Sequence, residues 1–368
     1  MDLGFTEEQE TLRTSARSFV EAETTPALAR HPEDAVLAAL WRKMVDLGWP
    51  AVAIPESDGG AGMGVVELLI VLEEVGRGIA PGPLFATAGQ FVPVLLHAAP
   101  GALRSEQLAA IPTGRTGTIA VGEDTGAWDP DATTTTARRS GNGWRLTGTK
   151  RFVIEGGHAD ELAVLARTDT GLGLFLVPGR DVAAEAVSSL DPSLRLAHVK
   201  LDDVEIEPER VLAPPGAAKA VLERSLGESA TAAAALIVGA CDAILARTVD
   251  YAKTRRQFDQ PIGRFQAVKH KLADMYVAVE RARSLLYFAG LTVAENDARR
   301  GIATSMAKAA AGDCQRLLVQ DGLQLHGGIG FTWEYDLHLY LKRAASLDSL
   351  LGDSRLHRRR VARHLGLT

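Results

Sequence analysis

The stretch Tyr251–Met275, YAKTRRQFDQPIGRFQAVKHKLADM, constrains the fold more than any other part of the sequence. It begins as the polar end of a helix and then contains Pro261 and Gly263, which stop a helix for different reasons. After this break, apolar residues return in steps of three and four over residues 265–286. Such steps place one apolar stripe against a neighbouring helix. The stretch therefore predicts two packed helices joined by a corner.

The corner itself has two interpretations. It is either an ordinary charged corner of a helical bundle or a surface that presents Arg255, Gln257 and Phe258 to an anionic or flat ligand. A second segment, QDGLQLHGGIGFTWEY at residues 320–335, favours the ligand. Its glycines crowd one short loop, and glycines let a backbone come very close to a flat or phosphorylated ligand.

Composition excludes several classes of protein. The 368 residues are 46% hydrophobic and 23% charged, as in a soluble globular chain of two or three domains. A net charge of -6 argues against a nucleic-acid partner. Cys241 and Cys314 lie in helical patterns, so we expect core thiols and neither a disulfide framework nor a metal site. Without a signal-peptide pattern or a run of about 18 apolar residues, the expected location is the cytoplasm, away from membranes.

The hydrophobic pattern divides the chain into three parts. Residues 1–113 predict helices. Residues 114–212 contain short segments separated by Gly, Asn and Asp turns, which predict strands of a small β-barrel or sandwich. The predicted strands are TGTIAVG, GWRLTGTKRFVI, ELAVLART, LGLFLVP and LAHVKLDDVEI. Residues 213–368 predict four long helices with short links. The expected fold class is α+β, with an N-terminal helical domain, a central β-domain and a C-terminal four-helix bundle.

Two motifs in the C-terminal half, RxQFxxPIGxFQxxxHxLADM and QxHGGxGFTxE, resemble those of the acyl-CoA dehydrogenase family. The segments GWRLTGTKRFVIEGGHAD and LGW…IPExxGGxG are also similar to family patterns, so the resemblance covers nearly the whole chain. It implies the acyl-CoA dehydrogenase fold. It also implies FAD-dependent α,β-dehydrogenation of an acyl-CoA thioester, in fatty acid or steroid side-chain catabolism.

The resemblance also implies a set of cofactor-binding residues. The corner motif matches family positions that reach the flavin's adenosine-pyrophosphate side from a neighbouring subunit, and an arginine fork suits a diphosphate. The glycine loop matches the segment along the same diphosphate. One FAD is then built from two chains, which implies at least a dimer. The predicted FAD-binding residues are Arg255, Gln257, Phe258, Gln324, Gly327 and Gly328, with Phe152 at the position of a Trp beside the flavin and Ser354 at the Thr of a terminal E-G-T-x-Q.

The chain also departs from the family pattern. Residues 121–126, VGEDTG, stand in place of a T-E-P-x-x-G-S-D-like loop, so flavin and acyl contacts from that loop do not carry over. Ile154 stands where the family has a Thr and has no hydroxyl to offer the flavin. Leu356 stands where the family has a Gln and cannot replace its amide.

The catalytic base is the largest departure. Many family members carry it as the Glu of E-G-T, which aligns with Gly352, and Asp353 comes one residue late. Other members carry the Glu on the first bundle helix, at the position of Ser229. Glu228 precedes that position and lies about 100° around the helix from it. Glu228 is therefore the catalytic candidate, and an exposed helix acid is the alternative interpretation.

Two hypotheses remain. The chain is an acyl-CoA dehydrogenase with a relocated base, or it is a non-catalytic, FAD-supporting subunit. The family includes α2β2 heterotetramers, notably in actinobacterial steroid side-chain degradation, in which one subunit lacks the glutamate. The resemblance implies an acyl-CoA substrate, electron-transfer flavoprotein or a similar acceptor, and either a homo-oligomer or such a heterotetramer.

Overall fold

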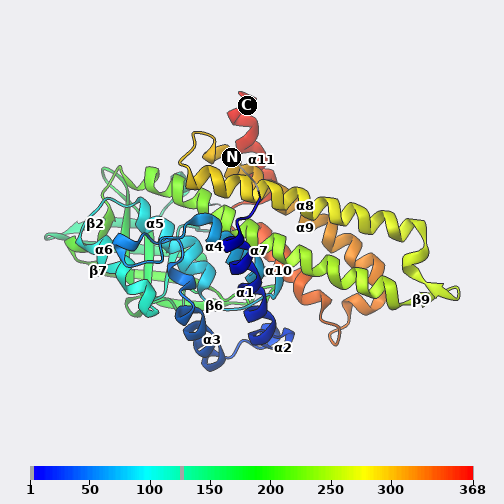
Figure 1. The fold of residues 1–368 in the computed structure, drawn as a ribbon. Coiled ribbons are helices and arrows are strands. Elements are labelled where there is room, and N and C mark those ends of the chain that lie inside the picture. Colours follow the sequence, from blue (N-terminus) through cyan, green and yellow to red (C-terminus); the bar gives the residue numbers. More distant parts are fainter. Residues whose placement is uncertain (1–3, 125–127, 368) are drawn as a thin grey trace. The chain divides into compact units, whose positions relative to one another are not determined.

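The structure is a computed structural model that describes residues 4–124 and 128–367 (Figure 1). These form two compact units. Unit 1 comprises Met1–Pro32, Leu69–Pro81 and Ala230–Thr368, and unit 2 comprises Glu33–Leu68 and Gly82–Ser229. Unit 1 is helical, whereas unit 2 combines shorter helices with a β-sheet.

Helices of unit 1 include the four long C-terminal helices that the sequence predicted and, in the described residues, a further helix at Ser354–His364 that it did not predict. The N-terminal helix begins at a capping box, in which Thr6 and Gln9 each bond the other's backbone N–H. The long bundle helices α8 and α9 pack along each other (Figure 1). The helices that lie in unit 1, wholly or in part, are α1 (Glu7–Glu23), α2 (Pro26–Arg30), α4 (Val65–Arg77), α7 (Ala218–Thr254), α8 (Gln266–Ala294), α9 (Arg300–His326), α10 (Leu337–Ser349) and α11 (Ser354–His364).

Two glycines bring α4 and α7 into backbone contact. A Cβ added at Gly76 of α4 would lie 2.2 Å from the carbonyl oxygen of Leu236, and one added at Gly239 of α7 would lie 1.8 Å from that of Glu73. No side chain fits at either position. The most apolar segment of α7 is long and apolar enough to cross a membrane. However, 89% of this segment is buried inside the protein. Burial of this kind is typical of a core helix.

Buried charges surround this helix contact. Glu73 accepts hydrogen bonds from Arg283 Nε at 2.8 Å and from the Tyr287 hydroxyl at 2.7 Å. Glu74 is paired with Arg17 at 2.7 Å. Burial raises the pKa of Glu73, and the Arg283 guanidinium opposes that rise. Each of these two buried carboxylates therefore has a cation against it, as the cost of burying a charge requires.

Unit 2 is built on an eight-stranded, mainly antiparallel sheet with the strand order β6-β7-β3-β2-β4-β5-β8, and β1 pairs in parallel with β4. The sequence predicted β1, β3, β4, β5 and β7 but missed β2, β6 and β8. The strands are β1 (Gly117–Ala120), β2 (Thr136–Ser140), β3 (Gly143–Ile154), β4 (Glu161–Thr168), β5 (Gly171–Pro178), β6 (Ala183–Val187), β7 (Leu196–Ile206) and β8 (Val211–Ala213).

Short helices accompany the sheet: α3 (Asp34–Asp46), α5 (Val92–His97) and α6 (Ala102–Ala110). A π-helix, Phe85–Phe91, runs directly into α5 and packs against β1. The sheet core is apolar, with Trp144 and Phe175 meeting edge to face at 5.4 Å. This core fixes the ends of β1 and β3, from which the residues of interest project.

One ion pair is buried in unit 2. Lys150 of β3 is fully buried and its Nζ lies 2.7 Å from Glu123 Oε1. Burial lowers the pKa of Lys150 to about 8, against the opposing charge of Glu123. Burial would raise the pKa of Glu123, but bonds from Lys150 and Thr134 outweigh it and lower that pKa to about 2. Both groups are therefore charged at neutral pH.

We expect Lys150→Met to destabilise the β-sheet unit strongly. The change leaves the Glu123 carboxylate buried without its cation, which typically costs about 3–5 kcal/mol. Arg145→Met is the matched control, because Arg145 and Asp203 form an exposed pair, worth at most about 1 kcal/mol. Chemical denaturation with a probe in the sheet measures both variants. Equal, small losses of stability would show that the buried pair is not needed.

Candidate functional site

The corner after α7 is a small hairpin. Helix α7 ends at Thr254, so the prediction of a helix running through Arg255–Phe258 was wrong at this end. Strands β9 (Arg256–Gln257) and β10 (Gln260–Pro261) pair instead, and α8 starts only at Gln266. The hairpin turns through Phe258 and Asp259, at φ of 51° and 63°, and the turn interrupts the helical hydrogen bonds before the proline does.

Side chains of the hairpin are presented outward. Phe258 is 86% exposed, and Arg255 and Gln257 are exposed as well. Arg255 forms no ion pair with any residue that the structure describes. An exposed aromatic ring and a guanidinium without a carboxylate partner, both at one hairpin, suit a ligand that is both flat and anionic.

A stacked pair joins this hairpin to the glycine loop. The ring of Tyr251, one turn before Arg255, stacks on the His326 ring at 4.4 Å, and Arg255 N donates to Tyr251 O at 2.8 Å. His326 is the last residue of α9, and Gly327 follows it directly. The structure therefore brings together, at one end of unit 1, the two motifs that the sequence separates by about sixty residues.

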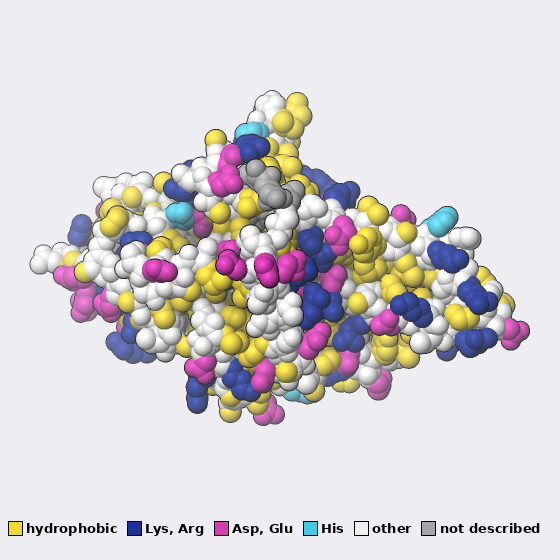
Figure 2. Space-filling model, viewed as in Figure 1, with side chains coloured by type: hydrophobic (Ala, Val, Ile, Leu, Met, Phe, Trp, Pro, Cys, Tyr) yellow, Lys and Arg dark blue, Asp and Glu magenta, His cyan; other side chains and the backbone are white. Residues whose placement is uncertain are grey.

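The backbone of the glycine loop is open. Gly327 has φ of 64°, which favours glycine, and a Cβ built at either Gly327 or Gly328 would meet nothing within 4 Å. Gln324 is exposed just before the loop. Figure 2 shows Lys and Arg side chains gathered at the end of the helices that carries β9. Exposed cations and open backbone in one place fit a diphosphate.

In unit 2, Phe152 occupies an unusual conformation. It is 40% exposed, has φ of 54°, and meets the His198 ring edge to face at 5.2 Å. A bulky residue in the left-handed region is strained, and such residues concentrate at functional sites. Ile154, two residues on, is buried. Residues 125–127, within or next to the replaced loop, lie outside the described part of the chain.

Glu228 is not the exposed helix acid of the alternative interpretation. Its side chain is 14% exposed, and its Oε1 lies 2.5 Å from His97 Nε2. His97 is the last residue of α5, which continues the π-helix of unit 2. The half-buried carboxylate and the imidazole are thus held together as a hydrogen-bonded pair. The neighbouring Ser229, by contrast, is fully buried and donates to the Ser225 carbonyl oxygen.

The loop that carries Gly352 is rigidly held. Fully buried Lys308 donates to the carbonyl oxygens of Asp348 at 2.8 Å and of Gly352 at 3.0 Å. His357 Nε2 lies 3.0 Å from Leu351 O, and burial lowers the pKa of His357 to about 4. Burial likewise lowers the pKa of Lys308 to about 8, against the opposing charge of Asp348. Ser354 is buried too, and its hydroxyl accepts from Arg316 at 2.9 Å.

Asp353, which follows Gly352, and Glu123, in the segment 121–126, have structural roles. The Asp353 carboxylate caps α11 by accepting from Leu356 N at 2.8 Å. Glu123 is held by Lys150 and by the hydroxyl and backbone groups of Thr134 and Thr135. Neither is available as a mobile base.

Several residues were missed by the sequence analysis. His97 and Lys308 gave no signal, because one ends a short helix and the other lies in an alanine-rich one. Gln90 on the π-helix is fully buried, and neither polar atom of its amide has a hydrogen-bond partner among the described residues. Cys241 and Cys314 are buried as predicted. Among the described residues, no group of three or more His, Cys, Asp or Glu could hold a metal ion.

Comparison with known families identifies the class of protein. The acyl-CoA dehydrogenase N-terminal domain matches residues 6–115, the middle domain matches residues 118–207 and the C-terminal domain matches residues 219–366. The chain belongs to the acyl-CoA dehydrogenase family, whose members are oxidoreductases. The three-part fold expected from the sequence is confirmed.

The chain is similar to several individual members of the family. It is 34% identical to the acyl-CoA dehydrogenase IpdE2 of Mycobacterium tuberculosis, over 96% of each chain. It matches a chain of the ChsE4–ChsE5 complex of the same organism at a TM-score of 0.90, with 30% identity over 100% of both chains. It also matches a variant of the Tcur3481–Tcur3483 steroid acyl-CoA dehydrogenase at a TM-score of 0.87, with 32% identity over 99% of both chains.

The predicted cofactor agrees with these relatives. A structure described as an FAD-dependent dehydrogenase matches at a TM-score of 0.89, with 26% identity over 100% of both chains. The family is thus one of flavoproteins.

We expect Gly352→Glu not to create a catalytic base. Gly352 has φ of 94°, which strains any L side chain, and an added Cβ would lie 2.3 Å from Leu356 Cδ2. The variant should lose about 1–3 kcal/mol of stability from strain and gain no dehydrogenase turnover. Gly141→Ala is the control for strain alone, because Gly141 has φ of 59° and nothing within 4 Å of its added Cβ. Turnover in the Gly352→Glu protein above that of the wild type would contradict this.

Proposed function

We propose that the protein is an FAD-binding subunit of an acyl-CoA dehydrogenase that works as a complex, with a second dehydrogenase chain supplying the base. The reaction is α,β-dehydrogenation of an acyl-CoA thioester. The Gly352 loop carries this proposal, because the position that aligns with the family's Glu is a left-handed glycine held by Lys308. The two-protein names of the ChsE4–ChsE5 and Tcur3481–Tcur3483 relatives support it.

The reaction defines what the protein must provide. The α-hydrogen of a CoA thioester is weakly acidic and needs a positioned carboxylate to remove it. FAD, when bound, supplies the acceptor for the β-hydride. Hydrogen bonds must polarise the thioester carbonyl as negative charge develops on it. Among these requirements, a surface for the cofactor is easier to assign to this chain than a catalytic base.

The residues that would hold FAD are those of the hairpin and the glycine loop. Arg255 would pair with the diphosphate, and the open backbone of Gly327 and Gly328 would lie along it. Phe258 would cover a flat part of the cofactor. Because these groups face outward, we infer that they complete the site of a neighbouring subunit, while Phe152 lies beside the chain's own flavin.

A second candidate function is a homomeric dehydrogenase with Glu228 as its base. The contact between Glu228 and His97 favours it, because a half-buried carboxylate beside an imidazole has the reach and the partner that a proton acceptor needs. The two functions differ in where the base lies: on α7 of this chain, or on a partner.

The acyl group is proposed to derive from a fatty acid or a steroid side chain. The steroid acyl-CoA dehydrogenase among the relatives supports the second source. A cytoplasmic location and electron-transfer flavoprotein or a similar acceptor complete the proposal. Comparing turnover on straight-chain and steroid side-chain CoA thioesters would separate the two substrate classes.

Arg255→Ala is expected to weaken FAD binding. The variant loses a charge-assisted hydrogen bond to the diphosphate, worth about 1.5–3 kcal/mol, so flavin affinity should fall by about ten- to a hundredfold. The flavin content of purified protein, alone and co-expressed with a partner dehydrogenase, measures this. Arg180→Ala is the control, because Arg180 is 86% exposed in unit 2. Colourless wild-type protein that takes up no FAD in either preparation would refute the proposal.

Glu228→Gln separates the two candidate functions. The change keeps the size of the side chain but removes its basicity. If Glu228 is the base, turnover should fall by about 10²–10⁴-fold while FAD and CoA-ester binding survive. If a partner supplies the base, turnover of the complex should change little, and the partner's glutamate should be indispensable.

Glu223→Gln serves as the matched control, since Glu223 is an exposed acid on the same helix. Native mass measured beside turnover shows which assembly is active. An active homomer that survives Glu228→Gln would contradict both functions, because Asp353 and Glu123 are already committed to structural contacts.

A further inference from the structure

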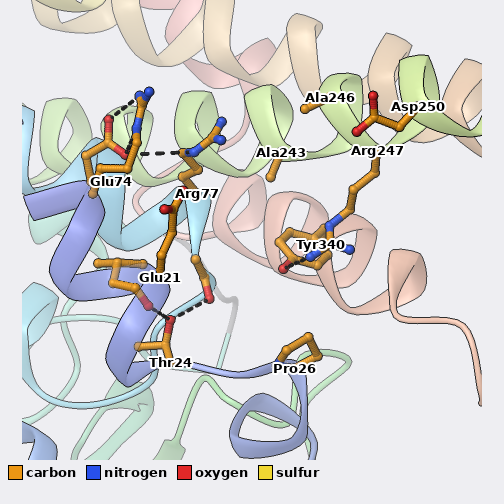
Figure 3. A pocket seen from close by; sticks show the side chains of 13 residues that line it. Glu21, Thr24, Pro26, Glu74, Arg77, Ala243, Ala246, Arg247, Asp250 and Tyr340 are labelled. Carbon is orange, nitrogen blue, oxygen red and sulfur yellow. Dashed lines mark hydrogen bonds and ion pairs between the residues drawn. The ribbon is translucent and has the colours of Figure 1, made fainter. Parts of the chain in front are cut away.

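A hollow of about 380 Å³ lies in unit 1 among α1, α4, α7 and α10, apart from the hairpin and the glycine loop, with which it shares no residue (Figure 3). Its volume falls within the range of about 300–1,000 Å³ that is typical of small-molecule sites. The lining residues are Arg17, Val20, Glu21, Thr24, Pro26, Glu74, Arg77, Gly78, Ala243, Ala246, Arg247, Asp250 and Tyr340.

Helix geometry explains why the space is open. Ala243, Ala246, Arg247 and Asp250 follow helical steps of three and four, so one face of α7 lines the hollow. This face begins one turn after Gly239, where α7 touches α4. Helix α4 then ends at Arg77, and the alanines do not fill the space that it leaves. Figure 3 shows Arg247 reaching from α7 to Tyr340 across this space.

The three arginines of the hollow differ in their partners. Arg17 is paired with Glu74, and Arg77 with Asp242. Arg247 has no carboxylate partner among the residues that the structure describes. Its guanidinium lies 4.3 Å from the centre of the Tyr340 ring and donates to the Tyr340 hydroxyl at 2.5 Å. A guanidinium has five N–H donors, so most of those of Arg247 remain available.

The charges that line the hollow favour a singly charged anion over a doubly charged one. Arg17, Arg77 and Arg247 are offset by Glu21, Glu74 and Asp250, so the lining is neutral in sum. The carboxylates of Glu21 and Asp250 are exposed and would repel a doubly charged phosphate. A single carboxylate matches the fork of Arg247 in charge and shape. Apolar surface from Val20, Pro26, Ala243 and Ala246 suits the body of such a molecule.

We propose that this hollow is a binding site for a small organic monocarboxylate, anchored by Arg247. The carboxylate accepts a bidentate pair of hydrogen bonds from the guanidinium, and the apolar body of the ligand lies against the two alanines of α7. Tyr340 orients the guanidinium through its ring and hydroxyl and is a positioning residue.

Benzoate is the probe, tested on the full-length protein as purified, with any bound flavin and partner present. Ligand-observed NMR titration is expected to show saturable binding. Arg247→Gln should weaken it at least tenfold, which corresponds to about 1.4 kcal/mol. Ala246→Phe, which fills the hollow without changing a charge, should weaken it equally. Arg281→Gln, an exposed arginine of α8 outside the hollow, is the control and should leave the affinity unchanged.

Melting temperature and flavin content, measured on every variant, separate loss of the ligand from loss of the fold. Equal benzoate affinity in the wild type, Arg247→Gln and Ala246→Phe would overturn the proposal, as would the absence of saturable binding into the millimolar range. Inorganic phosphate that competes as strongly as benzoate would overturn the assignment to a monocarboxylate. None of these results depends on dehydrogenase activity.

Discussion

Contact between the backbones of α4 and α7 is the constraint on which unit 1 depends. Gly76 and Gly239 meet the carbonyl oxygens of Leu236 and Glu73 at distances that no Cβ could occupy. Helices this close leave no room for apolar side chains between them. The unit instead holds its carboxylates beside the contact, each against an arginine. Close backbone packing of α4 on α7 is thus accompanied by ion pairs from α4 to α8 and α1.

The sequence predicted elements best where a single pattern controlled them. Strands β3, β4 and β7 were recovered with their bounds, because apolar patterning and flanking turns mark each of them. The exposed strand β6 was missed, since all but the last of its residues face solvent and carry no apolar pattern. The sequence placed the end of α7 at the proline because the turn at Phe258 and Asp259 was not recognised. Both residues have a positive φ, and neither is a glycine, the residue that usually marks such a turn.

The proposed site residues divide in the same way. Arg255 and Gly327 were proposed from motifs, because a ligand surface needs particular residue types at a fixed spacing. Their closeness in space could not be predicted in this way, since it rests on the stacking of Tyr251 on His326 across two helices. The contact between Glu228 and His97 could not be predicted from the sequence for the same reason, since the two residues lie 131 positions apart. Long-range contacts of this kind follow from packing and leave no local periodicity.

The surface proposed for the cofactor and the loop that aligns with the family's base differ in how firmly the chain holds them. The groups proposed to bind the cofactor, Arg255 and the open glycines, are exposed. The loop that would carry the base is closed instead, with Lys308 bonded to its carbonyl oxygens and Asp353 committed to a helix cap. A buried lysine whose hydrogen bonds hold two backbone oxygens stabilises one loop conformation and tolerates few others. Under the proposed function, a fixed loop without a base, together with an exposed surface for the cofactor, suits the subunit that holds the flavin while another chain performs the proton transfer.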